Sequence, residues 1–356
     1  MALDFRSDTV TTPTPAMYAA MQSAPLGDDV LGHDPTVERL EREAAARFGK
    51  EAGLFFPSGT MANQAAVRTH TVEGQVVLLG SASHIFNFEV GGAALHARVQ
   101  TYPIPERDGY LRWDDLAPAI RHETVHSAGT GLICLENTHN ILGGRVFPLT
   151  EMRRIADGAR ERGLPVHLDG ARIFNAQVAS GVDVRDYAAC ADTVMFCLSK
   201  GLCAPVGSML VGPADFLERA RRVRKAMGGG LRQAGILTAC GLVGLHDMVD
   251  RLADDHANAR TLAEGLNASG LIEPLDLATV QTNIVIAKLA ESAPALPDVV
   301  ARFAAHGLLC TSFPPRSIRL CTHKDVDATA VAEAIRIAGA VAEELGLRAG
   351  TPAQVA

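Results

Sequence analysis

Short apolar runs alternate with helical segments over the first two thirds of the chain, and this alternation restricts the folds that the chain can adopt. The runs lie at residues 54–56, 76–79, 132–135, 166–169, 194–198 and 205–212. Most of them end in small or polar residues, as strands that are buried on both faces of a sheet do. The alternation therefore predicts an α/β fold: a three-layer α/β/α domain around a mainly parallel sheet.

The ends of the chain follow other patterns. Residues 1–33 are rich in turn-forming residues, and we expect an N-terminal arm that packs on a larger body. Asp34 and Pro35 are typical of a helix N-cap and first helical residue, and they open the predicted large domain of residues 34–239. From about residue 240 a long helical region precedes strands and helices. We therefore expect a connecting helix and a small α+β domain at residues 240–356.

Composition narrows the classes of partner and compartment. The chain has 356 residues, of which 47% are hydrophobic and 21% charged, as expected of a packed globular protein. Its net charge of 33 − 40 = −7 gives no reason to expect a nucleic acid or a membrane surface as partner. The seven cysteines form no CxxC pair, and the N-terminus lacks the pattern of a signal peptide. We expect a cytoplasmic protein with reduced thiols.

Lys200 follows one of these apolar runs. Residues 194–201 read Val-Met-Phe-Cys-Leu-Ser-Lys-Gly, so a buried strand delivers Lys200 at its carboxyl end. Ligands of open α/β sheets bind at that edge. A neutral amine there can form a Schiff base with an aldehyde such as pyridoxal phosphate (PLP). The alternative is a surface lysine at a strand end.

Further candidate residues follow other predicted strands. Residues 58–60, Ser-Gly-Thr, lie where a strand passes into a helix, which suits either an anion site or a simple helix cap. His84 and Asp169 each stand at a strand end, and Arg172 follows three residues later. A buried carboxylate at position 169 needs a cation, which either a pyridinium nitrogen or Arg172 could supply.

Polar residues elsewhere complete the set of candidates. Residues 136–140, Glu-Asn-Thr-His-Asn, follow a strand, and we expect them to form a hydrogen-bonded network. Arg232 follows three consecutive glycines, a turn that could present it to a phosphate or that serves only as a bend. Arg319 alternates with Ile318 and Leu320 and so points away from their face, toward a substrate carboxylate or solvent.

The order of these features along the chain resembles that of fold-type I PLP enzymes, and in particular of the low-specificity L-threonine aldolases in the aromatic amino acid β-eliminating lyase/threonine aldolase family. The matching segments extend over nearly the whole chain: residues 5–11, 27–30, 57–61, 83–86, 136–140, 167–172, 196–201, 228–233 and 319–323.

The resemblance implies a role for each matching residue. Lys200 would hold PLP covalently, Asp169 would pair with the pyridine nitrogen, and His84 would stack on the ring. The remaining roles are phosphate or cofactor binding by Ser58, Gly59, Thr60, Arg172 and Arg232, substrate carboxylate binding by Ser7, Arg172 and Arg319, and a second catalytic histidine at His126. Arg232 could reach in from a neighbouring subunit.

The implied reaction is aldol cleavage of L-threonine, L-allo-threonine and related β-hydroxy-α-amino acids to glycine and an aldehyde. His84, His126 or an ordered water could remove the hydroxyl proton. The alternatives are β-elimination, transamination or a non-catalytic PLP fold. The resemblance also implies a homotetramer, a dimer of dimers with the site at a subunit interface, and the sequence itself indicates no metal. Leu31 and His33 replace an aromatic residue and an acid that are common in the family, so we expect altered specificity on the aldehyde side.

Overall fold

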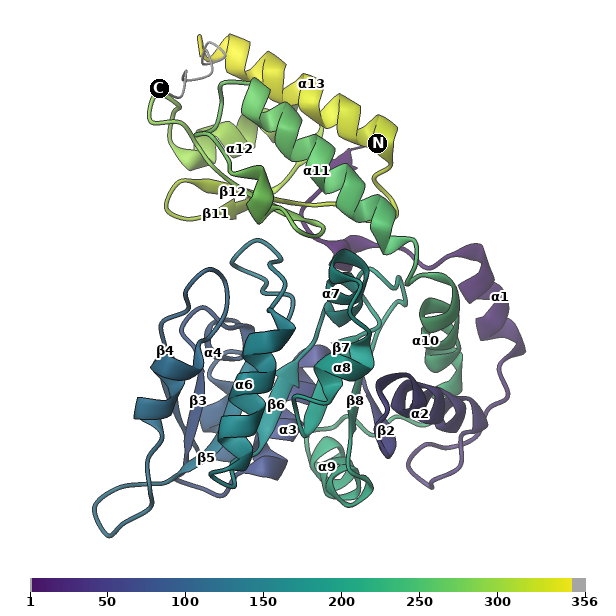
Figure 1. The fold of residues 1–356 in the computed structure, drawn as a ribbon. Coiled ribbons are helices and arrows are strands. Elements are labelled where there is room, and N and C mark those ends of the chain that lie inside the picture. The colour runs from purple at the N-terminus through teal and green to yellow at the C-terminus, as the bar shows by residue number, and fades with distance from the viewer. Residues whose placement is uncertain (1, 348–356) are drawn as a thin grey trace. The chain divides into compact units, whose positions relative to one another are not determined.

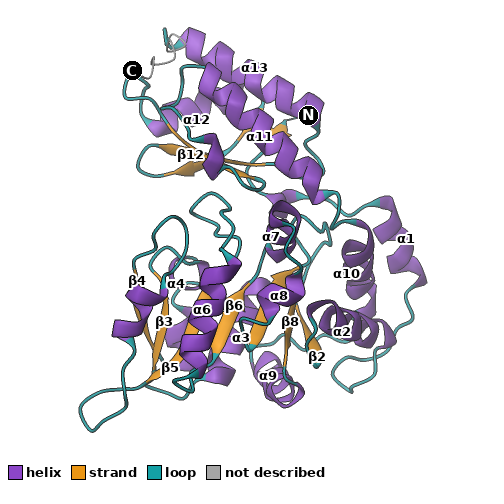
Figure 2. Cartoon of the chain, viewed as in Figure 1, coloured by secondary structure: helices purple, strands orange, loops and turns teal. Residues whose placement is uncertain are grey.

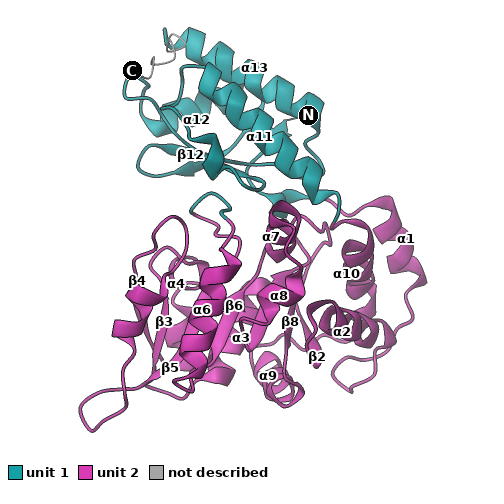
Figure 3. Cartoon of the chain, in the orientation of Figure 1, with its two compact units in different colours: residues 1–11, 142–145, 250–356 teal, residues 12–141, 146–249 magenta. Residues whose placement is uncertain are grey.

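The computed structural model describes residues 2–347, which divide into two compact units (Figures 1 and 3). The larger unit comprises residues 12–141 and 146–249, and the smaller unit comprises residues 2–11, 142–145 and 250–347 of the described chain. The predicted domain boundaries lie after residues 33 and 239. In the structure, residues 2–11 belong to the smaller unit, residues 12–33 belong to the larger unit, and the larger unit extends to residue 249.

The larger unit is built on a seven-stranded sheet with helices on both faces (Figure 2). Its strands are β2 (Ala52–Phe56), β3 (Val76–Gly80), β4 (Gln100–Ile104), β5 (Thr130–Glu136), β6 (Val166–Asp169), β7 (Thr193–Cys197) and β8 (Ser208–Gly212). Their order in the sheet is β2-β8-β7-β6-β5-β3-β4. Only β8 runs against its neighbours, which confirms the mainly parallel sheet predicted from the apolar runs.

Two helices of the larger unit precede the first strand of the sheet, and the others lie between or after its strands. In chain order the helices are α1 (Pro15–Ser23), α2 (Pro35–Phe48), α3 (Gly59–His70), α4 (His84–Asn87), α5 (Trp113–Leu116), α6 (Leu149–Arg160), α7 (Ile173–Ser180), α8 (Val184–Ala188), α9 (Ala214–Ala226) and α10 (Gly235–Asp247). Helix α2 begins as predicted, because the Asp34 carboxylate accepts hydrogen bonds from the backbone N–H groups of Thr36 and Val37. Gly49 ends it in the left-handed conformation, at φ 62°.

Strand β7 shows how the two faces of the sheet are covered. Met195 and Cys197 point to one face, where they pack with Ala62 of α3 and other apolar residues of α3 and α9. Phe196 points to the opposite face and stacks on Phe48 of α2, with ring centroids 4.7 Å apart. Because successive strand residues alternate between faces, an unbroken apolar run is what a strand between two helix layers requires.

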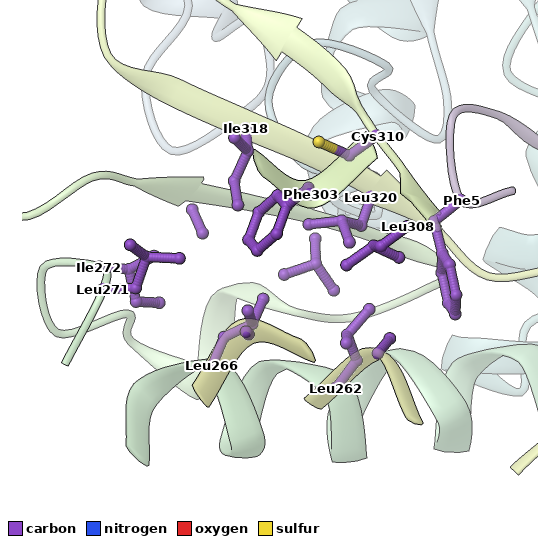
Figure 4. Close-up of a cluster of buried hydrophobic side chains, with 14 of the residues drawn as sticks. Phe5, Leu262, Leu266, Leu271, Ile272, Phe303, Leu308, Cys310, Ile318 and Leu320 are labelled. Atoms are coloured by element: carbon purple, nitrogen blue, oxygen red, sulfur yellow. The ribbon is translucent and has the colours of Figure 1, made fainter. Parts of the chain in front are cut away.

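The smaller unit is an α+β unit with its own hydrophobic core (Figure 4). Its elements are β1 (Leu3–Asp4), β9 (Ile284–Lys288), β10 (Leu308–Leu309), β11 (Thr311–Phe313), β12 (Ser317–Cys321), α11 (Leu252–Ala268), α12 (Leu296–Ala305) and α13 (Ala328–Glu344). Strand β12 is central in an antiparallel sheet of the order β11-β12-β9. Ile318 and Leu320 are fully buried, whereas Arg319 between them is only partly buried, as the alternation predicted.

The N-terminal residues complete this smaller core. Strand β1 pairs in parallel with β10, and Phe5 is fully buried among Leu262, Leu308 and other core residues. Burial of a phenylalanine side chain contributes about 1.5–3 kcal/mol. Residues 12–33 instead belong to the larger unit, where α1 packs on α10, so the predicted arm is divided between the two units.

All seven cysteines lie within the described residues, are buried and form no disulfide with one another. Within residues 2–347, the helices are all too short or too polar to cross a membrane.

Candidate active site

A cavity of about 280 Å³ lies at the carboxyl edge of the large sheet. Strands β2, β6 and β7 run in one direction and end at this edge, so the residues that follow them converge. Among the residues that line the cavity are the predicted Ser58, Gly59, Thr60, His84, Asp169 and Lys200. The structure thus brings together side chains that are up to 142 positions apart in the sequence (200 − 58).

The N-terminus of α3 forms one wall of this cavity. Ser58 caps the helix by accepting a hydrogen bond from the backbone N–H of Met61 at 3.2 Å. A Cβ atom on Gly59 would lie 3.0 Å from Cys197 Sγ and 3.4 Å from Ser208 Oγ, so only glycine fits without displacing its neighbours. Free N–H groups, hydroxyls and the positive end of a twelve-residue helix suit a phosphate.

Asp169 is the buried carboxylate of the site. It is 2% exposed, and its oxygens accept hydrogen bonds from Asn63 Nδ2 at 2.8 Å and from the backbone N–H of Ala171 at 3.1 Å. Both donors are neutral, so a cation placed against this carboxylate would offset the cost of burying its charge. A protonated pyridine nitrogen is such a cation, and the residues present therefore fit PLP.

His84 enters the cavity at the start of α4. Its Nδ1 lies 2.9 Å from Glu89 Oε1, and its backbone N–H donates to Glu136 Oε2 at 2.6 Å. Burial disfavours the imidazolium, but the hydrogen bond to Glu89 and the charges of Asp169 and Glu89 outweigh burial and the opposing charge of Lys200. The pKa of His84 is raised as a result.

Asn63 connects the two carboxylates of the site. Its Nδ2 donates to Asp169 Oδ2 and to Glu89 Oε1, each at 2.8 Å. Its Oδ1 therefore faces His167 Nε2, 3.1 Å away, which must carry the proton. One neutral amide supplies a donor to each of two buried anions, which no hydroxyl or carboxyl side chain could do.

A histidine–threonine chain continues behind Asn63. His167 Nδ1 lies 2.9 Å from Thr193 Oγ1, and His70 Nε2 lies 2.8 Å from the same oxygen. Since Nε2 of His167 is the donor to Asn63, its Nδ1 accepts from the threonine hydroxyl. Burial lowers the pKa of His167 to about 4 and that of His70 to about 3, so both rings are neutral near pH 7.

The polar residues after β5 form the predicted network. Glu136 Oε1 accepts from the backbone N–H of Asn140 at 2.8 Å, and His139 Nε2 lies 2.7 Å from Glu106 Oε1. Arg172, which is buried, donates to Asn140 Oδ1 at 3.4 Å. Burial is the main cause of the raised pKa of Glu136, opposed by His139. These hydrogen bonds hold in place the loop that follows β5 beside the site.

Other predicted residues of the larger unit lie outside this cavity. Arg232 forms an exposed ion pair with Asp28 at 3.3 Å. Leu31 is exposed on the turn that follows Asp28. His33, also exposed, lies 3.3 Å from Glu38. None of the three is among the described residues that line the cavity.

His126 is not brought to the cavity of its own chain. It lies on an exposed turn four residues before β5, at the amino end of that strand, whereas the cavity lies at carboxyl ends. Seven strand residues extend roughly 20 Å. The ten-residue spacing from His126 to Glu136 thus places the histidine beside the opposite edge of the sheet.

Ser7 and Arg319 belong to the smaller unit. Ser7 accepts a hydrogen bond from the backbone N–H of Thr9 at 3.2 Å, at the start of the 3₁₀ turn Asp8–Val10. Arg319 lies on β12, opposite Thr311 of β11 and Ile286 of β9.

Three residues of the site were not singled out from the sequence: Asn63, Glu89 and His167. The available signal was an unusual placement of polar residues. Asn63 and Gln64 interrupt an otherwise alanine-rich buried face of α3, and His167 lies inside a buried strand. Such residues need polar partners, although the sequence does not say which.

A larger cavity of about 560 Å³ lies at the opposite edge of the same sheet. It contains a lysine, Lys50, whose Nζ donates to the backbone carbonyl of Ala191 at 2.6 Å, and a thiol, Cys190, whose pKa is raised by burial. Pro213, the N-cap of α9, also lines this cavity, but the backbone N–H of Ala214 at that helix start already donates to the Glu51 carboxylate at 3.0 Å. This cavity therefore lacks the combination found around Lys200.

Comparisons with known proteins agree with this geometry. Residues 4–292 match the family model described as beta-eliminating lyase. The chain is 44% identical over 333 residues to the low specificity L-threonine aldolase of Escherichia coli K12, covering 93% of this chain and 96% of that protein. It is 42% identical over 330 residues to low-specificity L-threonine aldolase 1 of Arabidopsis thaliana, covering 91% and 92%. Among solved structures, Leishmania major threonine aldolase superposes with a TM-score of 0.79 at 22% identity, covering 96% and 99%.

Proposed function

The chain belongs to the beta-eliminating lyase family, and from that premise we propose that it is a PLP-dependent aldehyde-lyase that cleaves L-threonine, L-allo-threonine and related β-hydroxy-α-amino acids to glycine and an aldehyde. One observation carries the proposal: Lys200, Asp169 and His84 line a single cavity that is closed by the N-terminus of α3.

The residues present fit PLP at its aldehyde, its ring nitrogen and its phosphate. When bound, PLP supplies an aldehyde that condenses with amines and a ring that accepts electrons. Lys200 would hold it covalently, Asp169 would pair with its ring nitrogen, and residues 58–60 would bind its phosphate. The glycine at position 59 supports this, since it lets the start of α3 lie close to Cys197 and Ser208 of the sheet, where a Cβ atom would press on both side chains.

The chain's own side chains then have separate tasks in the cleavage. Arg172, Ser7 and Arg319 would orient the substrate by its carboxylate, which fixes the direction of the Cα–Cβ bond. A base must take the proton of the β-hydroxyl, so that Cβ becomes the aldehyde carbon and its bonding electrons stay with the glycine fragment. His84 is the titratable ring that lines the cavity, so we assign this proton to it.

The products distinguish this proposal from β-elimination and transamination. Purified protein loaded with PLP should release glycine and acetaldehyde in equal amounts from L-threonine and L-allo-threonine. Release of ammonia and a keto acid instead would assign the chain to one of the alternative reactions. Phenylserine, supplied as separate stereoisomers, tests whether Leu31 and His33 favour bulkier aldehydes.

We also propose a homotetramer, built as a dimer of dimers, in the reducing cytoplasm. The buried cysteines, which form no disulfide among the described residues, support the compartment. Exposed apolar side chains at Leu31, Val90 and Leu95 support subunit contacts. Arg232, outside the cavity of its own chain, would reach the phosphate of a neighbouring subunit. Light scattering tests the mass of the assembly. Recovery of activity when Lys200→Ala subunits are mixed with Arg232→Ala subunits tests whether two subunits share an active site.

A further inference from the structure

Glu89 has no role in the reaction as described so far, yet its carboxylate lies beside the proposed base. Its side chain is fully buried and accepts hydrogen bonds from three side chains. The donors are His84 through Nδ1, Asn63 through Nδ2 and Gln64 through Nε2. These three donors hold the carboxylate in one position and supply its oxygens with hydrogen bonds in place of water.

Two buried anions so close together require an explanation. One ring nitrogen of His84 and one carboxylate oxygen each from Glu89 and Asp169 all lie within 4.8 Å of one another. Like charges at this distance repel each other. Asn63 offsets part of this repulsion because it donates one N–H to each carboxylate. The His84 ring lies beside Glu89, and in the proposed function the ring nitrogen of PLP would lie beside Asp169.

We propose that Glu89 is a positioning residue, which holds His84 with its proton on Nδ1 so that Nε2 is the nitrogen left to take the β-hydroxyl proton. The inference rests on the proposed function for the identity of that proton. Its structural part, the carboxylate–histidine pair and the tautomer that it imposes, stands independently. Carboxylates in other enzymes orient a histidine base in the same way and stabilise the imidazolium that proton transfer forms.

The charges around His84 determine the direction of its titration. Glu89 and Asp169 favour the imidazolium, Lys200 disfavours it, and the Glu136 carboxylate accepts from the backbone N–H of His84. When the charge of Glu89 is removed, less remains to favour the imidazolium of His84, whereas burial and the charge of Lys200 still disfavour it. The pKa of His84 should therefore fall when Glu89 becomes neutral.

Glu89→Gln is the variant of choice because its surroundings can accept an amide. Gln64 Oε1 is buried and has no hydrogen-bond partner among the described residues. If the Gln64 amide rotates, this oxygen accepts from the new amide at position 89, while the retained oxygen at position 89 still accepts from Asn63 and His84. Glu89→Asp keeps the charge but shortens the side chain. Glu43→Gln is a matched control, since Glu43 lies 2.7 Å from His246 in an exposed pair.

The first measurement is NMR of the PLP-free protein carrying ¹⁵N- and ¹³C-labelled histidine, with His84→Asn used to assign the signal. In the wild type, His84 should carry its proton on Nδ1 when neutral and should titrate above pH 6.5. In Glu89→Gln the titration should move down by about one pH unit or more, since one pH unit is a tenfold change in the protonation equilibrium. Glu43→Gln should leave the His84 signal unchanged.

The second measurement is the pH profile of kcat for the PLP-loaded enzyme. In Glu89→Gln the acidic limb should move down with the pKa of His84, and the plateau should drop on the order of tenfold or more with a smaller change in KM. Glu89→Asp should keep the limb near its wild-type position.

The proposal is overturned if neutral His84 in the wild type carries its proton on Nε2, a result that requires no folded variant. An unchanged titration of His84 in Glu89→Gln also overturns it. Absence of aldol cleavage by the wild type with the predicted NMR behaviour intact would instead contradict the proposed function alone.

Discussion

The Asn63 amide donates a hydrogen bond to the Asp169 carboxylate at 2.8 Å, across 106 positions of sequence. This bond, together with the backbone N–H of Ala171, fixes the carboxylate that we assign to the cofactor ring nitrogen. A side chain of α3 thus helps to determine where the negative charge of the site is held.

Asn63→Ala should therefore weaken PLP binding. A hydrogen bond to a charged group contributes about 1.5–3 kcal/mol, which corresponds to roughly a 10- to 150-fold higher Kd for PLP. Equilibrium dialysis or absorbance titration of the PLP-free protein measures this. Asn267→Ala is a suitable control, because Asn267 also makes two hydrogen bonds, both to Leu275 in the smaller unit. Equal PLP affinities in both variants would contradict the role given to Asn63.

Lys200→Ala should abolish the adduct that borohydride traps between the protein and PLP, because the proposed covalent link would be lost. Lys50→Ala should keep it, since Lys50 lies in the cavity at the opposite edge of the sheet. Mass spectrometry of peptides after reduction locates the adduct. An adduct that persists in Lys200→Ala would move the cofactor to another lysine.

Arg319→Ala should weaken the binding of the amino acid far more than that of PLP. A guanidinium that holds a carboxylate through two charge-assisted hydrogen bonds contributes several kcal/mol, so KM should rise on the order of 100-fold. Steady-state kinetics with L-threonine and a PLP titration of the same variant separate the two effects. Arg336→Ala removes an exposed arginine paired with Glu333 and should change neither value. Parallel losses of PLP and substrate affinity would show that Arg319 has another task.

Features that depend on neighbours in the sequence could be predicted from it. The capping residues of α2 and the strands that end at Asp169 and before Lys200 follow from local patterns. The rule that ligands bind at the carboxyl edge of a parallel sheet then brings those residues together without any knowledge of distances. The fold and the central part of the cavity were accessible for this reason.

Features that depend on contacts between distant segments could not be predicted from the sequence. Glu89 and Asn63 are 26 positions apart, and nothing local distinguishes their bond from that of any other buried polar pair. His126 is separated from Glu136 by the extended strand β5, so its spacing does not bring it to the cavity of its own chain, and its catalytic role stays a prediction. The long helical region predicted from about residue 240 is likewise two helices, α10 and α11, separated at residues 248–251.

Neutral buried histidines should make the protein sensitive to acid. Burial lowers the pKa of His70 to about 3, and those of His167 and His256 to about 4, whereas unfolded histidines titrate near 6.5. Between about pH 6.5 and 4 the unfolded chain binds protons that the folded chain does not. These groups therefore contribute stability that is fully present above pH 6.5 and is lost as the pH falls through this range.

His70→Asn removes one of these groups and so tests the effect. The free energy of unfolding, measured with denaturant between pH 4 and 6, should fall less steeply with decreasing pH than in the wild type, by up to about 1.4 kcal/mol per pH unit. Loss of the contact between His70 and Phe216 will lower stability at every pH, so only the slopes are compared. His33→Asn, which changes an exposed ring, should keep the wild-type slope. If His70→Asn and His33→Asn give the same slope as the wild type, the His70 ring takes up its proton equally in the folded and unfolded chains.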